Sequence, residues 1–200
     1  MFHRKQCKTI NAKNSNKPNG WRQTYQKASA TRRNSKTKEK IKKAKKRPLS
    51  GRDLTDLLQN QREFIGVCAS DQICNLKLHQ FPCYFIINIA ESSISNGHWI
   101  AIRISKSHVE IFDSLGCNPA NWGHYPRTLL SFLQCYSYSH KFELSPVLQS
   151  PQSNMCGLYC VFFIVYRCNF SFSCLLDKFT QNLNKNDKIL FHLLQNMYNI

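Results

Sequence analysis

The basic charge of this chain is concentrated in its first quarter, and this limits how much of the chain can pack into a core. Residues 1–50 hold 17 of the 28 Lys and Arg residues but one of the 11 acidic residues, for a net charge of +16. The rest of the chain carries 11 basic and 10 acidic residues and is nearly neutral. A Lys-, Asn-, Ser- and Thr-rich segment buries too little apolar surface to offset its conformational entropy. We therefore expect a disordered basic arm over residues 1–48 and one folded domain over residues 49–200.

The arm has its densest run of positive charge just before Pro48. Such clusters are typical of polyanion binding or nuclear import, because lysines neutralise phosphates without reading sequence. The plain alternative is a tail that only keeps the protein soluble. The candidate DNA-contacting residues are Lys36, Lys38, Lys40, Lys42, Lys43, Lys45, Lys46 and Arg47.

The ten cysteines do not predict a disulfide scaffold or a metal site. Residues 1–8 are polar and basic with no apolar stretch after them, so we expect no secretion and reduced thiols. Cys68, Cys74 and Cys83 lack the paired CxxC spacing of a zinc site, so no metal is expected. The longest apolar run, residues 158–166, is too short to span a bilayer, which needs about 20 residues. We expect no membrane partner, and most of the cysteines to be small buried residues.

Hydrophobic periodicity indicates an α+β domain. Residues 50–58 and 128–138 predict helices, as do residues 177–199. Residues 81–90, 98–104 and 108–112 predict three strands, with a turn at residues 113–116. Residues 155–167 are ambiguous. Their β-branched and aromatic residues favour a strand, but thirteen residues that are apolar on all sides also fit a fully buried helix.

Four side chains are suited to nucleophilic catalysis. Cys156 precedes Gly157 at the head of the ambiguous apolar run, and Gln149 lies seven positions upstream. His98 begins one predicted strand and Asp113 follows the next, so a hairpin would bring them together at one edge of the sheet. A thiolate nucleophile needs a basic imidazole, a group that orients it and a donor for the oxyanion.

Each of these residues also has a plainer interpretation when taken singly. His98 could be an ordinary loop histidine, and Asp113 could simply begin a turn. His108 is an alternative base, but it lies at the other end of the predicted hairpin. Trp99, next to His98, could shield the catalytic pair, line a substrate groove or be a half-buried strand residue.

Together, three segments resemble the adenain family of viral cysteine endopeptidases, within the Ulp1-like peptidase clan. They are residues 96–101 (NGHWIA), 111–116 (IFDSLG) and 149–160 (QSPQSNMCGLYC). The order His, acid, Gln, Cys is shared by the clan, and the Gln-x-Pro-x-Ser-x-x-Cys-Gly-Leu spacing is specific to the adenain side. Residues 63–67 look like a loop near the start of the adenain domain.

The resemblance implies a role for each of the four side chains. Cys156 would be the nucleophile, His98 the general base and acid, and Asp113 the group that orients His98. Gln149 would donate its side-chain N–H to the oxyanion beside the backbone N–H of Cys156. The implied fold is α+β, with a small central mixed β-sheet flanked by helices. Residues 155–167 would form a buried helix whose N-terminus holds the nucleophile and favours its thiolate.

The expected function is that of a viral cysteine endopeptidase. It would cleave capsid or core precursor proteins at apolar-x-Gly-x or Gly-Gly sites during virion maturation, as a monomer in the host nucleus and virion. The basic arm would bind DNA. The alternatives are a Ulp1-like isopeptidase that removes ubiquitin or SUMO, and a non-catalytic DNA-packaging protein. No cofactor is required by the sequence; DNA is a candidate activator, and the peptide cofactor of adenain is left open for this chain.

Overall fold

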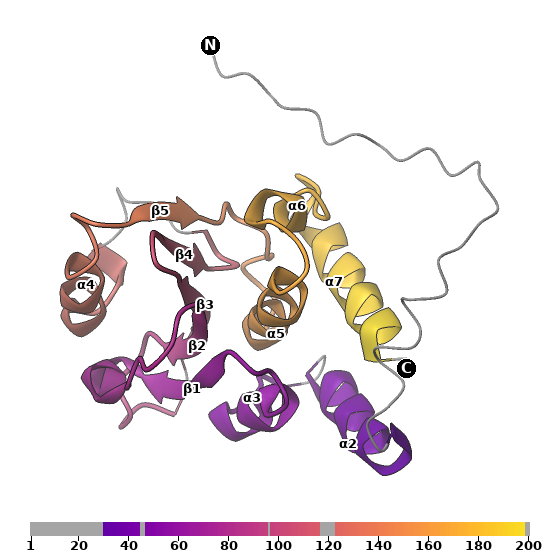
Figure 1. Cartoon of the computed structure of the whole chain (residues 1–200). Coiled ribbons are helices and arrows are strands. Elements are labelled where there is room, and N and C mark those ends of the chain that lie inside the picture. The colour runs from indigo at the N-terminus through magenta and orange to yellow at the C-terminus, as the bar shows by residue number, and fades with distance from the viewer. Residues whose placement is uncertain (1–29, 45–46, 96, 117–122, 199–200) are drawn as a thin grey trace, which may run out of the picture.

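The computed structural model describes residues 30–44, 47–95, 97–116 and 123–198. Within these ranges a five-stranded sheet has the order β1-β2-β3-β4-β5 (Figure 1). The β2–β3 and β3–β4 pairs are antiparallel, and the β1–β2 and β4–β5 pairs are parallel. The strands are β1 (Phe64–Ala69), β2 (Cys83–Asn88), β3 (Trp99–Ile104), β4 (His108–Phe112) and β5 (Lys141–Leu144).

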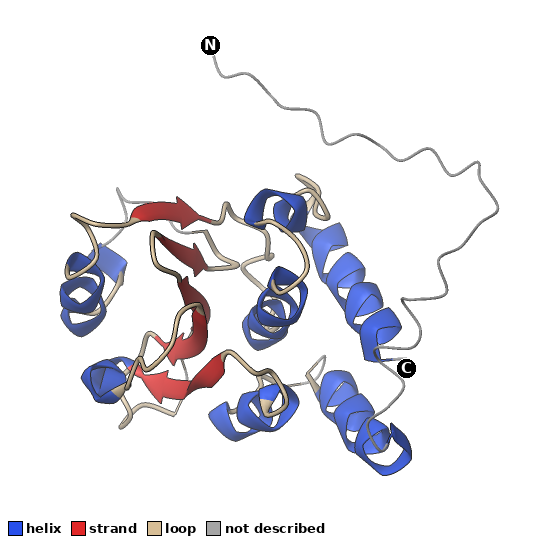
Figure 2. Cartoon of the chain, in the orientation of Figure 1, coloured by secondary structure: helices blue, strands red, loops and turns tan. Residues whose placement is uncertain are grey.

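Helices cover both faces of this sheet (Figure 2). They are α2 (Ala30–Lys43), α3 (Gly51–Leu58), the 3₁₀ helix η1 (Ser70–Asn75), α4 (Arg127–Gln134), α5 (Cys156–Arg167), α6 (Phe172–Leu176) and α7 (Leu183–Tyr198). Helices η1 and α4 pack on one face, and the other helices share a core on the opposite face. The predicted α+β fold, a mixed sheet flanked by helices, is confirmed. No helix in the described ranges is long and apolar enough to cross a bilayer.

Strand alternation divides the core into two layers. In β3, Trp99 and Ala101 face the α5 side, whereas Ile100, Ile102 and Ile104 face the α4 side. All six residues of β2 are buried, which explains why that strand has a continuous apolar run instead of an alternating one. The interior strands therefore match their predicted positions to within a few residues.

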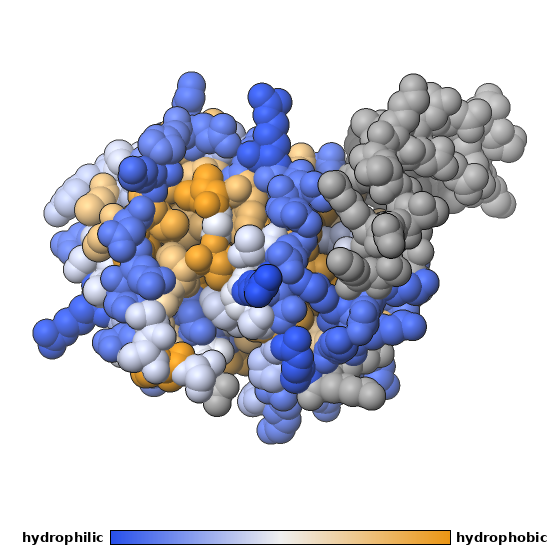
Figure 3. Space-filling view, turned by 90° about the horizontal axis from the view of Figure 1, so that it is seen from below, coloured by the Kyte–Doolittle hydropathy of each residue, from blue (hydrophilic) through white to orange (hydrophobic). Residues whose placement is uncertain are grey.

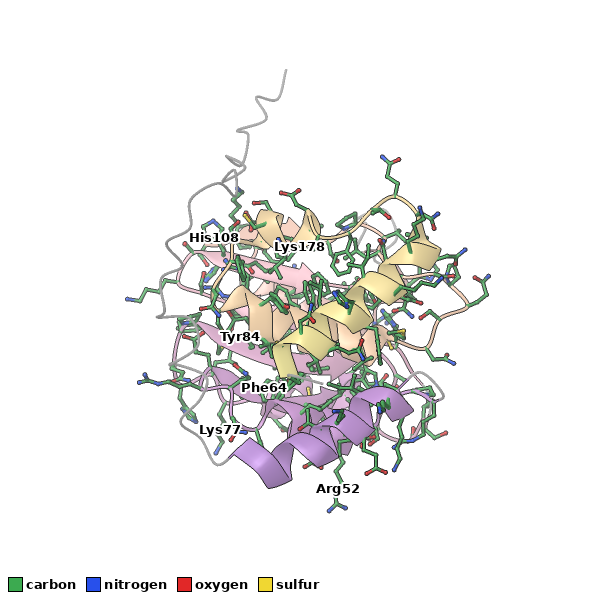
Figure 4. All side chains as sticks on the ribbon, turned by 90° about the vertical axis from the view of Figure 1, so that its right-hand side faces the viewer. Arg52, Phe64, Lys77, Tyr84, His108 and Lys178 are labelled. Carbon is green, nitrogen blue, oxygen red and sulfur yellow. The ribbon has the colours of Figure 1, made fainter. Side chains whose placement is uncertain are left out.

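The ambiguous segment forms the central helix α5. Ten of its residues, from Cys156 to Val165, are buried. Helix α7 lies in front of α5 and the sheet lies behind it in the view of Figure 4. The rings of Phe112 and Phe163 stack across the β4–α5 interface with centroids 4.9 Å apart. A helix surrounded on all sides can be apolar all round, so its environment overrides the strand propensity of its residues.

The expected disorder up to residue 48 is wrong for the described part of the arm. Ala30–Lys43 is helix α2, and Ile41 and Ala44 are buried in the α5-side core. Lys40 pairs with Asp53 and Asp56 of α3, and the Arg47 guanidinium lies 3.2 Å from Asp53. The surface on the side of α2 is hydrophilic (Figure 3). Ile41, Ala44 and the charge pairs with α3 therefore hold α2 against the folded domain. The average composition of the arm gave no sign of this contact.

The two outer strands were also not predicted. Residues 63–67 were expected to form a loop, but Phe64–Ala69 is strand β1. Its pairing with β2 shifts register between Phe64 and Gly66, and Gly66 has a φ of 143°. β5 has only four residues and none is fully buried. Short, half-exposed and irregular edge strands lack the periodicity from which the interior strands were predicted.

Candidate active site

The β3–β4 hairpin brings His98 and Asp113 together at one edge of the sheet. His98 precedes β3 and Asp113 follows β4, and the two strands pair from Ala101 with Phe112 to Ile104 with Val109. The His98 Nε2 atom lies 2.6 Å from Asp113 Oδ1, and the two side chains are 14% and 6% exposed. The contact that hairpin geometry predicted is therefore present.

Gly97 allows the chain to approach the sheet at this point. A Cβ at residue 97 would lie 1.9 Å from the Asn88 Oδ1 atom and 2.7 Å from the Ala90 Cβ atom. Asn88 is itself fixed, because its Oδ1 accepts a hydrogen bond from the Ala90 N–H at 2.9 Å. A side chain at residue 97 would displace His98, which is the next residue. Asn96, the first residue of this motif, lies outside the described residues.

Asp113 is held by neighbours that the sequence did not indicate. The Tyr125 hydroxyl donates to Asp113 Oδ2 at 2.6 Å, and the Leu115 N–H donates to Oδ1 at 2.9 Å. Burial acts to raise the pKa of Asp113, but its bonds to His98, Tyr125 and Leu115 outweigh burial and hold the pKa below its ordinary value. The carboxylate is therefore ionised and fixed. Tyr125 lies just before α4 in a segment without periodicity, so no local signal pointed to it.

His98 also contacts Cys156. Burial disfavours the charged ring and acts to lower the pKa of His98, but hydrogen bonds and charge interactions with Asp113 and Cys156 raise it to about 9. Because Asp113 occupies Nε2, Nδ1 is the ring nitrogen left for the thiol. The His98 ring thus lies between a carboxylate and a thiol, which is the arrangement that produces an imidazolium–thiolate pair.

Trp99 packs into the protein interior instead of forming an open groove wall. The residue is 9% exposed, and its Nε1–H donates to the Leu49 carbonyl at 2.9 Å. A Cβ at Gly51 would be 3.5 Å from the Trp99 ring. The residue after the proposed base therefore ties the start of the domain to the site.

Cys156 is the first residue of α5 and is 7% exposed. Met155 precedes it and provides no side-chain cap. The first N–H groups of a helix have no acceptor within the helix, and together with the helix dipole they favour an anion at this end. A Cβ at Gly157 would lie 3.2 Å from Leu49 Cβ and 3.3 Å from Leu54 Cδ2, so glycine lets α5 begin close against α3.

Gln149 lies in the interior on the chain that leads toward α5. It is 1% exposed, its Oε1 accepts from the Ser114 hydroxyl at 2.7 Å, and its Nε2 donates to the Ser153 carbonyl at 2.6 Å. A carbonyl oxygen can only accept, so the nitrogen must be the atom on the Ser153 side. The amide nitrogen has two hydrogens, and one of them remains for another acceptor.

Two cavities adjoin these residues. One, of about 280 Å³, is lined by His98, Asp113, Tyr125 and apolar atoms of Ile89 and Leu115. The other, of about 400 Å³, lies between residues 152–155 and the Asp187, Lys188 and Phe191 side chains of α7. A more spacious cavity of about 640 Å³ lies at the opposite end of α5, beside Arg167, and is remote from the candidate chemistry. The first cavity borders the proposed base and acid, and the second borders the segment just before Cys156.

The other candidate residues lie elsewhere. His108, labelled in Figure 4, is at the turn between β3 and β4, where its Nδ1 is 2.8 Å from the Ser107 hydroxyl. Among the described residues, no group of three His, Cys, Asp or Glu side chains could hold a metal ion. Of the basic candidates, Lys38 and Lys42 are exposed on α2, whereas Lys40 and Arg47 pair with α3. Lys43 pairs with Glu39 at 2.6 Å. Lys45, Lys46 and the Lys36 side chain lie outside the described residues.

Among the comparisons with known proteins, the one with solved structures found matches. No protein-family model matches the chain, and no curated protein matches its sequence. A crystal structure of a selenomethionine form of an ASFV protease is similar with a TM-score of 0.48 and 19% identity, over 72% of this chain and 65% of that chain. The match thus spans just under two thirds of that protein's chain. A likeness this low carries no information on activity or substrate, and the resemblance to adenain stays a prediction.

Proposed function

We propose that this chain is a cysteine endopeptidase whose nucleophile is Cys156. His98 acts as general base and then general acid, and Asp113 orients its ring. The Gln149 side-chain N–H and the Cys156 backbone N–H stabilise the oxyanion. The observation that carries the proposal is the contact series from Asp113 through His98 to the thiol at the start of a buried helix.

The proposed reaction has two steps. The Cys156 thiol gives its proton to His98, and the thiolate attacks the carbonyl carbon of the scissile peptide bond. The tetrahedral oxyanion is stabilised by the two N–H donors until His98 protonates the leaving amine and the C–N bond breaks. Water, deprotonated by His98, then hydrolyses the thioester and releases the acid product and the thiol. A pKa of about 9 for His98 supports an imidazolium as the resting form at neutral pH.

We further propose that the substrates are capsid or core precursor proteins with apolar-x-Gly-x or Gly-Gly sites, cleaved in the host nucleus and the virion. The apolar atoms of Ile89 and Leu115 beside His98 are suited to an apolar side chain. A glycine at the cleavage site suits a nucleophile that is only 7% exposed, because a larger side chain there would obstruct access. Ubiquitin-like proteins also end in Gly-Gly, so isopeptidase activity is an outcome that the substrate test must separate.

The basic arm is proposed to hold the protein on DNA. The net charge of +16 over residues 1–50 supports this, and Lys38 and Lys42 of α2 are exposed. Lys40 and Arg47 already pair with α3, so we expect them to contribute less to DNA binding. Binding to phosphates alone should weaken steeply with salt and show little sequence preference.

The first test is cleavage of a peptide library by purified protein, with and without DNA. We expect turnover by the unmodified chain and none by Cys156→Ala or His98→Ala. Cys168→Ala is the matched control, because Cys168 is an exposed thiol just beyond the other end of α5 and should not affect turnover. Turnover by Cys156→Ala would refute the assignment. Preference for Gly-Gly-terminated ubiquitin-like probes over apolar-x-Gly-x peptides would favour the isopeptidase instead.

A further inference from the structure

Two segments that carry the proposed acid and the proposed oxyanion donor are joined directly. The Ser145 hydroxyl accepts from the Asp113 N–H at 2.8 Å and donates to the Asp113 carbonyl at 2.7 Å. The Ser114 carbonyl accepts from the N–H groups of Leu148 and Gln149, both at 2.8 Å. These bonds fix the backbone after β4 against the backbone that leads to α5.

Ser114 makes one contact of a different kind in this junction. Its hydroxyl donates to Gln149 Oε1 at 2.7 Å, so it acts on the side-chain amide and not on the backbone. Both residues are 1% exposed, so water does not compete for this bond. The hydroxyl must be the donor, because the Gln149 nitrogen faces the Ser153 carbonyl and its oxygen therefore faces Ser114.

The backbone near Gln149 is also fixed from the side of α7. The Leu148 carbonyl accepts from Asn186 Nδ2 at 2.9 Å and from the Tyr159 hydroxyl at 3.2 Å, and Asn186 is fully buried. With the backbone held on both sides, the remaining freedom of Gln149 is the torsion of its side chain. Ser114 and the Ser153 carbonyl restrict that torsion from opposite ends of the amide.

We propose that Ser114 is a positioning residue for catalysis: its hydroxyl holds the Gln149 amide so that the second Nε2 hydrogen is presented to the oxyanion. Ser114 touches no reacting atom and acts only through Gln149. This inference rests on the proposed protease activity, and it adds a residue for which the motif resemblance implied no role. A donor that is fixed before the reaction needs no reorganisation when the oxyanion forms.

The effect of Ser114 should appear in acyl transfer and not in thiol reactivity. Peptide cleavage passes through an oxyanion, whereas alkylation of Cys156 by iodoacetamide depends only on the thiolate and its partner His98. We expect Ser114→Ala to lower kcat by about tenfold, the effect of one lost buried hydrogen bond, with KM nearly unchanged. The alkylation rate and its pH profile should stay as in the unmodified chain.

A double-mutant cycle tests whether Ser114 acts through Gln149. Gln149→Ala alone should lower kcat by about 100- to 1000-fold, as loss of an oxyanion donor does elsewhere. If Ser114 works through this amide, adding Ser114→Ala to Gln149→Ala should cause no further loss. The proposal would be overturned if the fold loss of kcat in the double variant equalled the product of the two single losses.

Ser70→Ala is the control for removing a buried serine hydroxyl. Ser70 in η1 is also 1% exposed, and its hydroxyl has no hydrogen-bond partner among the described residues. Its kcat should equal that of the unmodified chain. Ser114→Cys, which keeps a weak donor, should recover part of the activity that Ser114→Ala loses. An active unmodified enzyme with an unchanged kcat in Ser114→Ala refutes the positioning role, whereas an unmodified chain that cleaves nothing refutes the proposed function itself.

Discussion

At the scale of single residues, His98 shows how the site sets its own charge. Burial alone would keep the ring neutral, because a charge is costly away from water. The negative charge of Asp113 outweighs this effect of burial and favours the protonated ring. Tyr125 and the Leu115 N–H keep the Asp113 carboxylate ionised and in place. The acid therefore both orients His98 and raises its pKa to about 9.

This leads to a prediction about pH. The leaving amine takes its proton from His98, so kcat/KM should fall as pH rises through about 9 and that proton is lost. Asp113→Asn removes the negative charge beside the ring, so the same fall should occur at lower pH. The measurement is the pH profile of kcat/KM for peptide cleavage by both proteins. If kcat/KM falls at the same high pH in Asp113→Asn and in the unmodified chain, Asp113 does not raise the pKa of His98.

The same shift affects folding stability. The pKa of His98 is raised from 6.5 to about 9, so the folded protein binds this proton more tightly than the unfolded chain. The resulting stabilisation of the folded state is fully present below about pH 6.5 and is lost as the pH rises through about 9. Asp113 acts in the opposite range: its pKa is lowered, so its contribution is lost as pH falls below the ordinary range of an aspartate.

At the scale of elements, what the sequence could predict depended on where the deciding contacts lie. Helix α3 was predicted because its apolar spacing and its cap are local, whereas α5 stayed ambiguous because its environment comes from the sheet and α7. The His98–Asp113 contact followed from hairpin geometry. Tyr125 and Ser114 did not, because their contacts join segments that no periodicity relates.

The junction of α2 and α3 gives a prediction at this scale. Asp53 closes a capping box with Ser50, accepting from its N–H at 3.1 Å and its hydroxyl at 2.7 Å, and it also pairs with Arg47 and Lys40. Asp53→Ala should lower the unfolding free energy by about 1–2 kcal/mol, mostly through loss of the cap. Asp56→Ala removes only an exposed pairing with Lys40 and should cost about 0.5 kcal/mol or less. Urea denaturation of both variants measures the difference, and equal losses would show that the cap is unimportant.

At the scale of the whole molecule, one buried carboxylate connects the sheet to the helix layer. Glu110 in β4 is 1% exposed and lies 2.7 Å from Arg103 Nη1 of β3. Arg167, at the last turn of α5, binds it with two nitrogens at 2.7 and 2.8 Å. Burial acts to lower the pKa of Arg167, but its bonds to Glu110 outweigh this and raise it. This cluster lies at the end of α5 opposite Cys156. An ion pair with Glu110 fixes the Arg167 end of the helix, whereas the Cys156 end packs against α3.

The last prediction is that stability and catalysis are separable along α5. Glu110→Ala leaves two half-buried guanidinium groups without their shared partner, which should lower the unfolding free energy by about 3 kcal/mol. Glu143→Ala is the matched control, because Glu143 on the neighbouring strand β5 is more exposed than Glu110. It pairs with Lys141 at 3.6 Å and acts on Arg167 through its charge, so its removal should change stability little. Below the unfolding transition, kcat per folded molecule of Glu110→Ala should match that of the unmodified chain, because Asp113, His98, Gln149 and Cys156 keep their contacts. Denaturation and turnover measured on the same samples test this, and a fall in kcat at full folding would show that the Arg167 end of α5 also positions the nucleophile.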